Sequence, residues 1–312
     1  MATLKVAVIG AGAMGSLFGG SLAASGHEVW LVDVWKEHVE AINKNGLLIE
    51  EVGGRERIIK NVKATTDPRE VGTADLVLVF VKSAFTEEAT RGALPLFGGS
   101  TTAITLQNGL GNVEKIASVV GEERVTAGVT SHGSTMLGPG KIRHAGVGET
   151  LVGELDGRIT ERIRRIADAL NTAGIETKVT DNIQGAIWGK LIVNVGINPL
   201  TALTGLLNGQ LLDFKETEEL LEMVVGEAAE VAKRKGIRLT YDDPISHVKE
   251  VCRLTAANKS SMLQDVMNKR RTEIDVINGA IVKEGEKVGV STPANKVVTN
   301  LISVIQQNYK SK

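Results

Sequence analysis

The sequence contains a single cysteine, Cys252, which excludes an internal disulfide framework and indicates a reducing compartment. Its apolar and basic neighbours include no base that would activate the thiol, so we interpret Cys252 as a packing residue. No charged and apolar leader precedes the strand expected at Leu4–Ile9. This start predicts no secretory signal and a cytoplasmic protein.

Net charge is also nearly absent. A formal charge of −1 at pH 7 gives no electrostatic footprint for nucleic acid, and the basic cluster Lys269–Arg271 is typical of a solvated helix face. The stretch Leu191–Leu212 has no charged side chain and is long enough to suggest a membrane span, but five residues interrupt it: Asn194, Asn198, Pro199, Asn208 and Gln210. We predict a buried core helix followed by a loop, with neither a nucleic-acid nor a membrane partner.

Several catalytic patterns are missing as well. No Cys, His and carboxylate cluster has metal-ligand spacing, and neither a nucleophile elbow nor a G-x4-G-K-[ST] loop occurs. We therefore expect no metal ion and no covalent mechanism. His132 and His144 are candidate acids, but neither has a partner at a recognisable spacing, and we interpret both as structural.

The first half of the chain alternates short apolar runs with helical segments. The runs lack in/out alternation, which predicts strands buried on both faces of a parallel sheet, at Val6–Ile9, Val29–Val32, Leu76–Val81, Ala103–Leu106 and Val125–Val129. Glycine-punctuated strands at Lys141–Ala145 and Glu149–Gly153 suggest an antiparallel addition at the sheet edge. A helix at Thr160–Thr172 and a strand at Glu176–Thr180 would close this domain.

After Asp181 the pattern is helical, with starts and stops supplied by Gly236, the Asp242–Pro244 turn and Ser291–Pro293. The fold class is therefore α/β, with a domain at residues 1–180 followed by an all-α domain at residues 181–312. Helices are expected at Ile183–Leu203, Glu216–Lys235, Ile245–Ala257, Ser260–Arg270, Glu273–Val288 and Ala294–Tyr309.

A glycine motif opens the first helix. The residues that follow the first strand match G-x-G-x-x-G, and they are Gly10, Ala11, Gly12, Ala13, Met14 and Gly15. Gly10 permits a tight turn, Gly12 lets the backbone approach a pyrophosphate, and Gly15 lets the helix pack on the strand. Free N–H groups and the helix dipole would hold the anion. The motif predicts a dinucleotide-binding Rossmann domain.

Polar residues at the ends of other strands fit the same site. Asp33 ends the second strand, where an acidic residue binds the adenosine ribose, so it favours NADH over NADPH. Lys36 could neutralise a 2′-phosphate and argues the other way. Lys82 and Asn108 also follow strands, on the side where open α/β sheets bind ligands, although both could be solvated turn residues.

Lys190, Asn194 and Asn198 share one stripe of a helix, because residues at i, i+4 and i+8 drift by only ~40° per step. Burying such groups without partners would cost ~1 to 3 kcal/mol each, and more for the charge. The stripe should therefore line a wet or ligand-filled cleft. The alternative is that Lys190 reaches solvent and the asparagines cap or cross-link helices.

Longer motifs carry a family resemblance. Lys190-x3-Asn194-x3-Asn198-Pro199, Asn208-Gly209, Ser260–Asp265 and Thr272–Gly279 together resemble ketopantoate reductase (2-dehydropantoate 2-reductase). The resemblance implies that Lys190 is the general acid and that Glu273 closes on cofactor and substrate. It also implies that the substrate's carboxylate and hydroxyl groups are bound by four residues: Asn194, Asn198, Asn208 and Ser261. It places Asn108 at nicotinamide and substrate, with Lys82 and Ser134 at the cofactor.

The resemblance implies NAD(P)H-dependent reduction of 2-dehydropantoate to (R)-pantoate, in pantothenate and coenzyme A synthesis, with the small keto acid between the domains. Family members that use NADPH commonly have a basic residue where this chain has Asp33, so the nicotinamide preference stays open. Two alternatives also stay open. One is a reductase of another branched 2-keto acid on this fold, and the other is a non-catalytic dinucleotide sensor. The helical domain could also form a homodimer.

Overall fold

The computed structural model describes residues 3–311, which form two compact units. The first unit contains the residues through Gln107 together with Asn112–Ile183, and the second contains Asn108–Gly111 and the residues from Gln184 onward. The loop Asn108–Gly111 thus packs with the helical part of the chain, although it follows a strand of the first unit. A Cβ atom on Gly109, whose φ is +82°, would lie 2.4 Å from the Val276 carbonyl oxygen.

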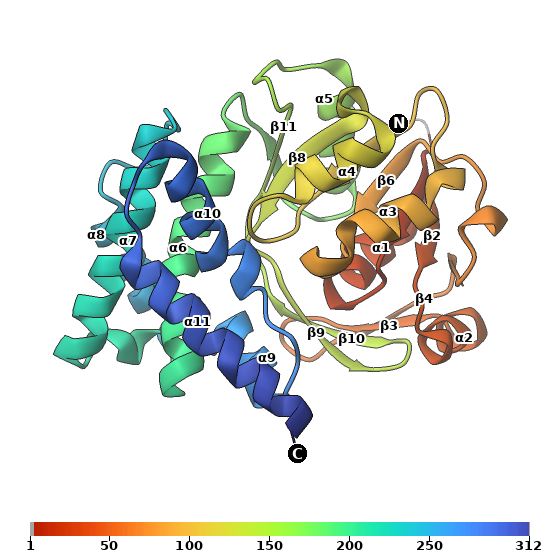
Figure 1. The fold of residues 1–312 in the computed structure, drawn as a ribbon. Coiled ribbons are helices and arrows are strands. Elements are labelled where there is room, and N and C mark those ends of the chain that lie inside the picture. Colours follow the sequence, from red (N-terminus) through yellow and green to blue (C-terminus); the bar gives the residue numbers. More distant parts are fainter. Residues whose placement is uncertain (1–2, 312) are drawn as a thin grey trace. The chain divides into compact units, whose positions relative to one another are not determined.

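The first unit is built on an eight-stranded sheet in the order β12-β11-β8-β7-β6-β1-β2-β5 (Figure 1). All neighbouring strands are parallel except β8 and β11, which are antiparallel. The strands are β1 (Lys5–Ile9), β2 (Glu28–Val32), β5 (Val62–Thr65), β6 (Leu76–Val79), β7 (Thr102–Thr105), β8 (Val125–Thr130), β11 (Thr150–Gly153) and β12 (Thr177–Val179). The α/β class and the parallel sheet predicted from the apolar runs are confirmed.

Both faces of this sheet are covered, which is why its strands lack alternation. On one face, Val6 and Val8 of β1 join a buried cluster with residues of α1 (Ala13–Ala24), α2 (Lys36–Asn45) and α5 (Glu161–Thr172). On the other, Ala7 and Ile9 join a cluster that includes Ile116 of α4 (Asn112–Val120). The short helix α3 (Thr86–Gly92) contacts α4.

A second sheet corrects one expectation. β11 does add to the sheet edge against β8, but β10 (Lys141–Gly146) belongs to a separate four-stranded sheet in the order β4-β3-β10-β9. Its other strands are β3 (Leu47–Glu50), β4 (Glu56–Ile59) and β9 (Gly133–Gly138). Ile142 and Ile49 are buried while their strand neighbours are not, so this sheet has one apolar face. β10 contributes Ile142 to that apolar face, and it therefore pairs within the small sheet rather than at the edge of the large one.

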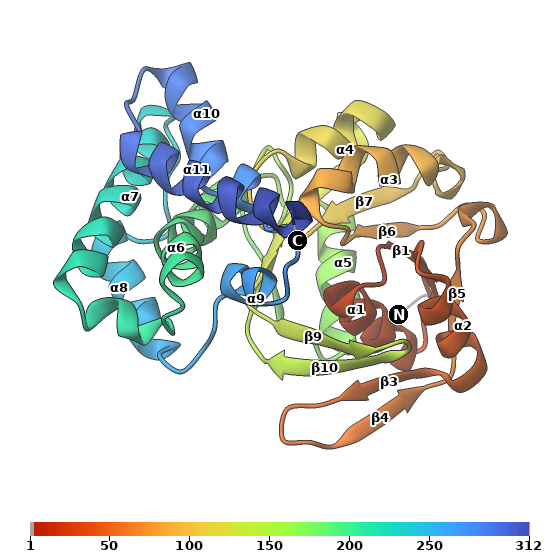
Figure 2. The same ribbon diagram turned by 60° about the horizontal axis from the view of Figure 1, so that its bottom comes forward.

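Helix α1 lies between the two sheets. Figure 2 shows it next to the β9–β10 hairpin of the small sheet. A Cβ on Gly19 would lie 2.5 Å from Leu31 in the large sheet, and one on Gly20 would lie 2.8 Å from Leu47 in the small sheet. The glycines therefore allow the helix to approach both layers. Because the helix is covered on two sides, its buried residues run without a break from Gly15 to Ala23.

The described residues of the second unit from Gln184 onward form helices and connecting loops, with no strand among them. Its helices are α6 (Ile183–Thr204), α7 (Lys215–Arg234), α8 (Pro244–Leu254), α9 (Ser261–Met267), α10 (Asn278–Val288) and α11 (Pro293–Gln307), with short 3-10 turns η5 (Gly209–Leu212) and η6 (Ile274–Val276). The expected all-α part is confirmed. Helix α6 is long and apolar enough to cross a membrane, but 72% of its most apolar window is buried within the protein. It packs among residues of α7, α8, α10 and α11 in one core.

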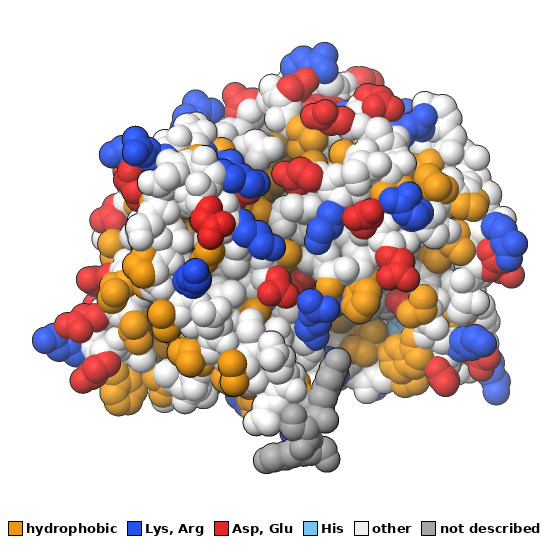
Figure 3. All heavy atoms as spheres, viewed as in Figure 1, with side chains coloured by type: hydrophobic (Ala, Val, Ile, Leu, Met, Phe, Trp, Pro, Cys, Tyr) orange, Lys and Arg blue, Asp and Glu red, His pale blue; other side chains and the backbone are white. Residues whose placement is uncertain are grey.

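Acidic and basic side chains are interspersed on the face shown in Figure 3 rather than gathered by sign.

Candidate active site

The glycine loop between β1 and α1 has the three geometries that the motif requires. Gly10 has a φ of +93°, and a Cβ there would lie 2.7 Å from the Val81 backbone nitrogen. A Cβ on Gly15 would lie 2.0 Å from the Gly10 carbonyl oxygen, so only glycine allows this approach of helix to loop. At Gly12 a Cβ would meet nothing within 4 Å. The space beside Gly12 is therefore open to a ligand.

The start of α1 suits a diphosphate. Gly12 is the N-cap and supplies no side-chain cap, and the first turn contains no acidic residue. The first N–H groups of a helix have no partner inside it, so these donors and the positive end of the helix dipole face the open space at Gly12. Ala13 and Met14 are only partly buried there. These residues fit the pyrophosphate of a dinucleotide.

Asp33 lies just beyond β2 and is tied to this loop. Its Oδ2 accepts the Ala11 N–H at 2.7 Å, and its Oδ1 accepts the Trp35 N–H at 2.9 Å. The carboxylate is thus fixed beside the glycine loop, where a ribose would lie. Lys36 is exposed at the first position of α2.

Two other cofactor candidates also lie in the first unit. Lys82 is exposed after β6, and Ser134 is on β9, a strand that contacts α1. The Ser134 hydroxyl donates to the Arg143 carbonyl at 3.1 Å across the hairpin. Its side chain is therefore engaged within the small sheet, where Ser134 pairs with His144 of β10.

In the second unit, Lys190 and Glu273 belong to one electrostatic group. Burial lowers the pKa of the Lys190 ammonium to about 8, and the negative charge of Glu273 opposes this shift. Asn108 joins them, because its Nδ2 donates to Glu273 Oε2 at 3.4 Å. Lys190 is only partly exposed, and its burial is the main cause of the lowered pKa, which argues against a side chain that extends into solvent.

The asparagines of the α6 stripe have different surroundings. Asn194 is partly buried, and its amide has no hydrogen-bond partner among residues 3–311. Asn198 is buried, and its Nδ2 lies 3.4 Å from the Oγ of Ser261 at the start of α9. One turn further, the Thr201 hydroxyl bonds the Ser260 hydroxyl at 2.7 Å. The structure thus brings Asn198 and Ser261 together by joining α6 to the N-terminus of α9.

Asn208 is placed apart from these residues. It is buried, its Nδ2 donates to Thr255 Oγ1 at 2.9 Å, and its backbone N–H donates to the Asn258 carbonyl at 3.0 Å. Its Oδ1 is buried and has no hydrogen-bond partner in the described part of the chain. Asn208 therefore contacts the loop that leads into Ser261, and it bonds neither Lys190 nor Asn198.

The two candidate histidines have partners that sequence spacing did not reveal. His132 Nδ1 lies 3.0 Å from His144 Nε2, and His144 Nδ1 lies 3.1 Å from Glu51 Oε2. Burial, and then the charge of His144, lower the pKa of His132. Sequence spacing could not show this series, because Glu51 is 93 residues from His144 in sequence and the pairing of β3 with β10 brings them together.

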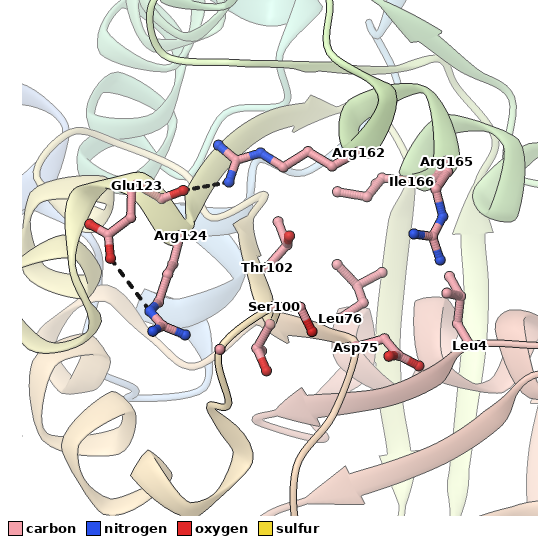
Figure 4. A pocket seen from close by; sticks show the side chains of 12 residues that line it. Leu4, Asp75, Leu76, Ser100, Thr102, Glu123, Arg124, Arg162, Arg165 and Ile166 are labelled. Atoms are coloured by element: carbon pink, nitrogen blue, oxygen red, sulfur yellow. Dashed lines mark hydrogen bonds and ion pairs between the residues drawn. The ribbon is translucent and has the colours of Figure 1, made fainter.

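A cavity of about 280 Å³ lies at the other end of the large sheet. It is lined by residues at the amino ends of strands, including Leu4, Asp75 and Thr102, and by three arginines (Figure 4). Arg162 is paired with Glu154 at 2.6 Å and Arg124 with Glu123 at 3.5 Å. Ligands of open α/β sheets bind at the carboxyl ends instead, so this cavity is separate from the glycine loop.

The parallel sheet, the glycine loop and the uncapped α1 are those of a dinucleotide-binding Rossmann domain. Two family models give the particular family: ketopantoate reductase PanE/ApbA matches residues 6–157, and its C-terminal model matches residues 182–306. The chain belongs to the ketopantoate reductase family, whose members are NAD(P)-dependent oxidoreductases acting on a CH–OH group.

Relatives match almost end to end. The 2-dehydropantoate 2-reductase of Halobacterium salinarum is 37% identical over 305 residues, covering 98% of this chain and 100% of the relative. That of Archaeoglobus fulgidus is 35% identical, covering 98% and 99%. Among solved structures, a PanE/ApbA family ketopantoate reductase from Ralstonia eutropha JMP134 has a TM-score of 0.91 at 36% identity, covering 98% and 99%. A ternary structure of D-mandelate dehydrogenase with NADH and anilino(oxo)acetate has a TM-score of 0.91 at 31% identity, covering 99% and 100%.

Proposed function

We propose that this chain reduces 2-dehydropantoate to (R)-pantoate with a nicotinamide dinucleotide, using Lys190 as the general acid. One observation carries the proposal: an ammonium with a pKa lowered to about 8 lies in one group with Glu273 and Asn108, in a chain of this family. We also propose the cytoplasm as its location, in keeping with the single cysteine.

The first unit would hold the dinucleotide. Residues Gly10–Gly15 offer backbone N–H groups to the pyrophosphate, and Asp33 accepts from the ribose hydroxyls. Lys82 and the backbone of Ser134 are proposed as further contacts. When bound, the reduced nicotinamide supplies the hydride. We propose NADH as the preferred form, because a fixed carboxylate at Asp33 repels a 2′-phosphate, whereas the exposed Lys36 and the usual NADPH of the family argue for NADPH.

Lys190 supplies the proton. Reduction of a ketone builds negative charge on its oxygen, and a proton donor within ~3 Å stabilises that charge. Burial destabilises the ammonium and so makes its proton easier to release near neutral pH, while Glu273 keeps enough of it charged to act as an acid. Glu273 also orients the Asn108 amide, which would contact both nicotinamide and substrate.

The remaining residues would hold the substrate in place. The Asn194 amide makes no hydrogen bond within residues 3–311, so it is available to a substrate. Asn198 and Ser261 place an amide and a hydroxyl 3.4 Å apart. Neutral groups bind a carboxylate and hydroxyls without the cost of burying another charge. Asn208 is proposed as a substrate contact through its unpartnered, buried Oδ1, which a substrate hydroxyl could donate to after a small rotation of the side chain.

A steady-state assay with 2-dehydropantoate tests the reaction, run in parallel with NADH and NADPH. The expected result is turnover with 2-dehydropantoate and a higher kcat/KM with NADH. Cofactor binding without oxidation by any 2-keto acid would overturn the proposal in favour of a dinucleotide sensor.

A second candidate substrate class comes from the D-mandelate dehydrogenase structure at 31% identity. It favours a 2-keto acid with another side chain on the same architecture. Ketoisovalerate, oxaloacetate and phenylglyoxylate serve as competing substrates in the same assay. A kcat/KM for any of them above that for 2-dehydropantoate would support this second candidate and contradict the first.

We also propose a homodimer through the helical unit. Three apolar side chains on one stripe of α11 are exposed by about half or more: Val297 57%, Leu301 49% and Val304 63%. Exposed apolar side chains that lie together mark protein–protein interfaces. Sedimentation of the wild type and of Leu301→Glu measures it, and a monomeric wild type would contradict the proposal.

A further inference from the structure

Pro199 lies inside α6 and removes a hydrogen-bond donor from it. In an α-helix the N–H of residue i donates to the carbonyl of residue i−4, and proline has no N–H. The carbonyl of Val195 therefore lacks its helical partner. Val195 is fully buried in the core of the helical unit, so solvent cannot replace the missing donor. A buried acceptor left in this state would destabilise the fold.

The side chain of Asn278 supplies the missing donor. Its Nδ2 donates to the Val195 carbonyl at 3.2 Å, from the first residue of α10. Asn278 is fully buried, and the second hydrogen of the same amide goes to Asn295 Oδ1 at 3.0 Å. The orientation of the amide is therefore set by two acceptors.

A chain of bonds fixes Asn295 in turn. Its Nδ2 donates to the Val224 carbonyl at 3.0 Å and to Glu227 Oε2 at 2.7 Å. The Glu227 carboxylate also accepts the backbone N–H groups of Ala294 and Asn295, at 2.8 and 2.9 Å, and so caps α11. The donor that reaches α6 is thus held by α7, α10 and α11 together.

The Asn278 oxygen shows that this amide is not an ordinary packing residue. Oδ1 is buried and has no hydrogen-bond partner among residues 3–311. A carboxamide with an unsatisfied acceptor costs free energy that an apolar side chain of similar size would not. The Nδ2 group explains why an asparagine is present, because it donates to the Val195 carbonyl that Pro199 leaves without a helical donor.

The two segments joined by this bond carry the proposed chemistry. Asn194 precedes Val195, Asn198 precedes Pro199, and Glu273 is separated from Asn278 only by the turn η6 and Ile277. We infer that Asn278 is a positioning residue. By satisfying the carbonyl that Pro199 leaves open, it fixes α6 against the segment that carries Glu273, and so sets the place of Lys190 and Asn198. This inference rests on the proposed function of those residues.

A double-mutant cycle tests the pairing. In Pro199→Ala the alanine N–H can donate to Val195, so the bond from Asn278 is no longer needed. Asn278→Ala is expected to raise the KM for the keto acid by about tenfold in the wild-type background and by less than threefold in Pro199→Ala. The dinucleotide Kd is expected to stay the same in all four proteins. Equal effects in both backgrounds would overturn the inference.

Asn171→Ala is the matched control. Asn171 also bonds backbone through its amide, to the Thr177 carbonyl and N–H at 2.8 Å each, but in the first unit. It is expected to lower the unfolding midpoint without coupling to Pro199 and without changing the keto-acid KM. The same cycle on the unfolding midpoint needs no substrate. If no 2-keto acid is reduced, the proposed function and the positioning role both fail, whereas additive midpoints alone would show that the Pro199–Asn278 pair itself is absent.

Discussion

The Nε2 atom of His38 lies 3.3 Å from the Oγ of Ser16, and both side chains are buried. His38 Nδ1 accepts the Gly140 N–H at 2.9 Å, so the ring is neutral with its proton on Nε2. The Ser16 hydroxyl accepts from that proton and donates to the Ala11 carbonyl at 2.7 Å. A line of hydrogen bonds thus connects the β9–β10 turn to the glycine loop, and sequence patterns gave no sign of it.

Replacing His38 should therefore affect dinucleotide binding as well as stability. His38→Leu leaves the Gly140 N–H and the Ser16 hydroxyl without their partner, which should destabilise the fold by about 1 to 3 kcal/mol. The dinucleotide Kd should rise, because the loop loses a support. His247→Leu is the control, since His247 stacks on Tyr241 in the second unit. A dinucleotide Kd that is the same for both variants would contradict the role of His38.

The same pair predicts a pH dependence. Burial lowers the pKa of His38 from its ordinary value of 6.5, so the unfolded chain binds the proton more readily than the folded one. Stability from this group is then present above pH 6.5 and is lost as the pH falls below it. The difference in unfolding free energy between wild type and His38→Leu should shrink from pH 7 to about pH 5. Chemical denaturation at several pH values measures it, and a constant difference would count against a neutral buried His38.

Two glycines of the loop predict opposite kinds of defect. At Gly15 a Cβ would lie 2.0 Å from the Gly10 carbonyl oxygen, so Gly15→Ala should destabilise the fold by about 1 to 3 kcal/mol or more. At Gly12 φ is −60° and the Cβ space is open, so Gly12→Ala should change stability by less than about 1 kcal/mol. It should nevertheless raise the dinucleotide Kd by about tenfold, because the methyl group occupies the pyrophosphate space. Thermal unfolding and fluorescence titration separate the two, and unchanged dinucleotide affinity in Gly12→Ala would place the pyrophosphate elsewhere.

Local sequence patterns predicted those parts of the fold that depend on residues close together in the chain. The glycine loop, the buried parallel strands and the succession of helices after Asp181 are set by residues a few positions apart, and the structure confirms the α/β class they predict. The small sheet was missed because β3, β4 and β9 lack a continuous buried run: alternate residues are buried in β3, one in β4 and none in β9. All three strands contact α1, which lies far from β9 in sequence.

Within the site, spacing along α6 could identify a polar stripe but not its partners. The contacts of Asn108 with Glu273 and of Asn198 with Ser261 join residues 165 and 63 positions apart. The Glu51, His144 and His132 series and the bond from Asn278 to Val195 are likewise long-range. A periodic sequence pattern cannot predict such contacts, because they form only when distant elements pack together. The missing donor at Pro199, by contrast, is a local feature that the sequence alone already contains.

Asp33 offers a direct test of cofactor preference. Asp33→Asn keeps the shape and one acceptor oxygen, so it loses the negative charge and one of the two backbone N–H bonds, from Ala11 or from Trp35. The ratio of kcat/KM for NADPH to that for NADH should rise about tenfold, because the repulsion of the 2′-phosphate is lost. Asp67→Asn is the control, since Asp67 caps a short turn and pairs with Arg69 instead. An unchanged ratio in Asp33→Asn would show that another residue reads the ribose.

Lys190 should determine the alkaline limit of activity. With a pKa of about 8, its ammonium is present below that pH and is lost above it, so kcat/KM should fall about tenfold per pH unit on the alkaline side. Lys190→Ala should lower kcat by ~10²-fold or more and remove this limb, with the dinucleotide Kd nearly unchanged. A Lys190→Ala enzyme with comparable turnover would rule out Lys190 as the acid.

Glu273 should tune that limit through its charge. The carboxylate raises the pKa of Lys190 against the effect of burial, so Glu273→Gln should let the pKa fall further and move the alkaline limb to lower pH. The glutamine keeps an acceptor for the Asn108 amide, which separates the loss of charge from the loss of the hydrogen bond. A full pH profile of kcat/KM for wild type and Glu273→Gln measures the shift. A limb that stays in place, or that moves to higher pH, would mean that the Glu273 charge does not act on the group that donates the proton.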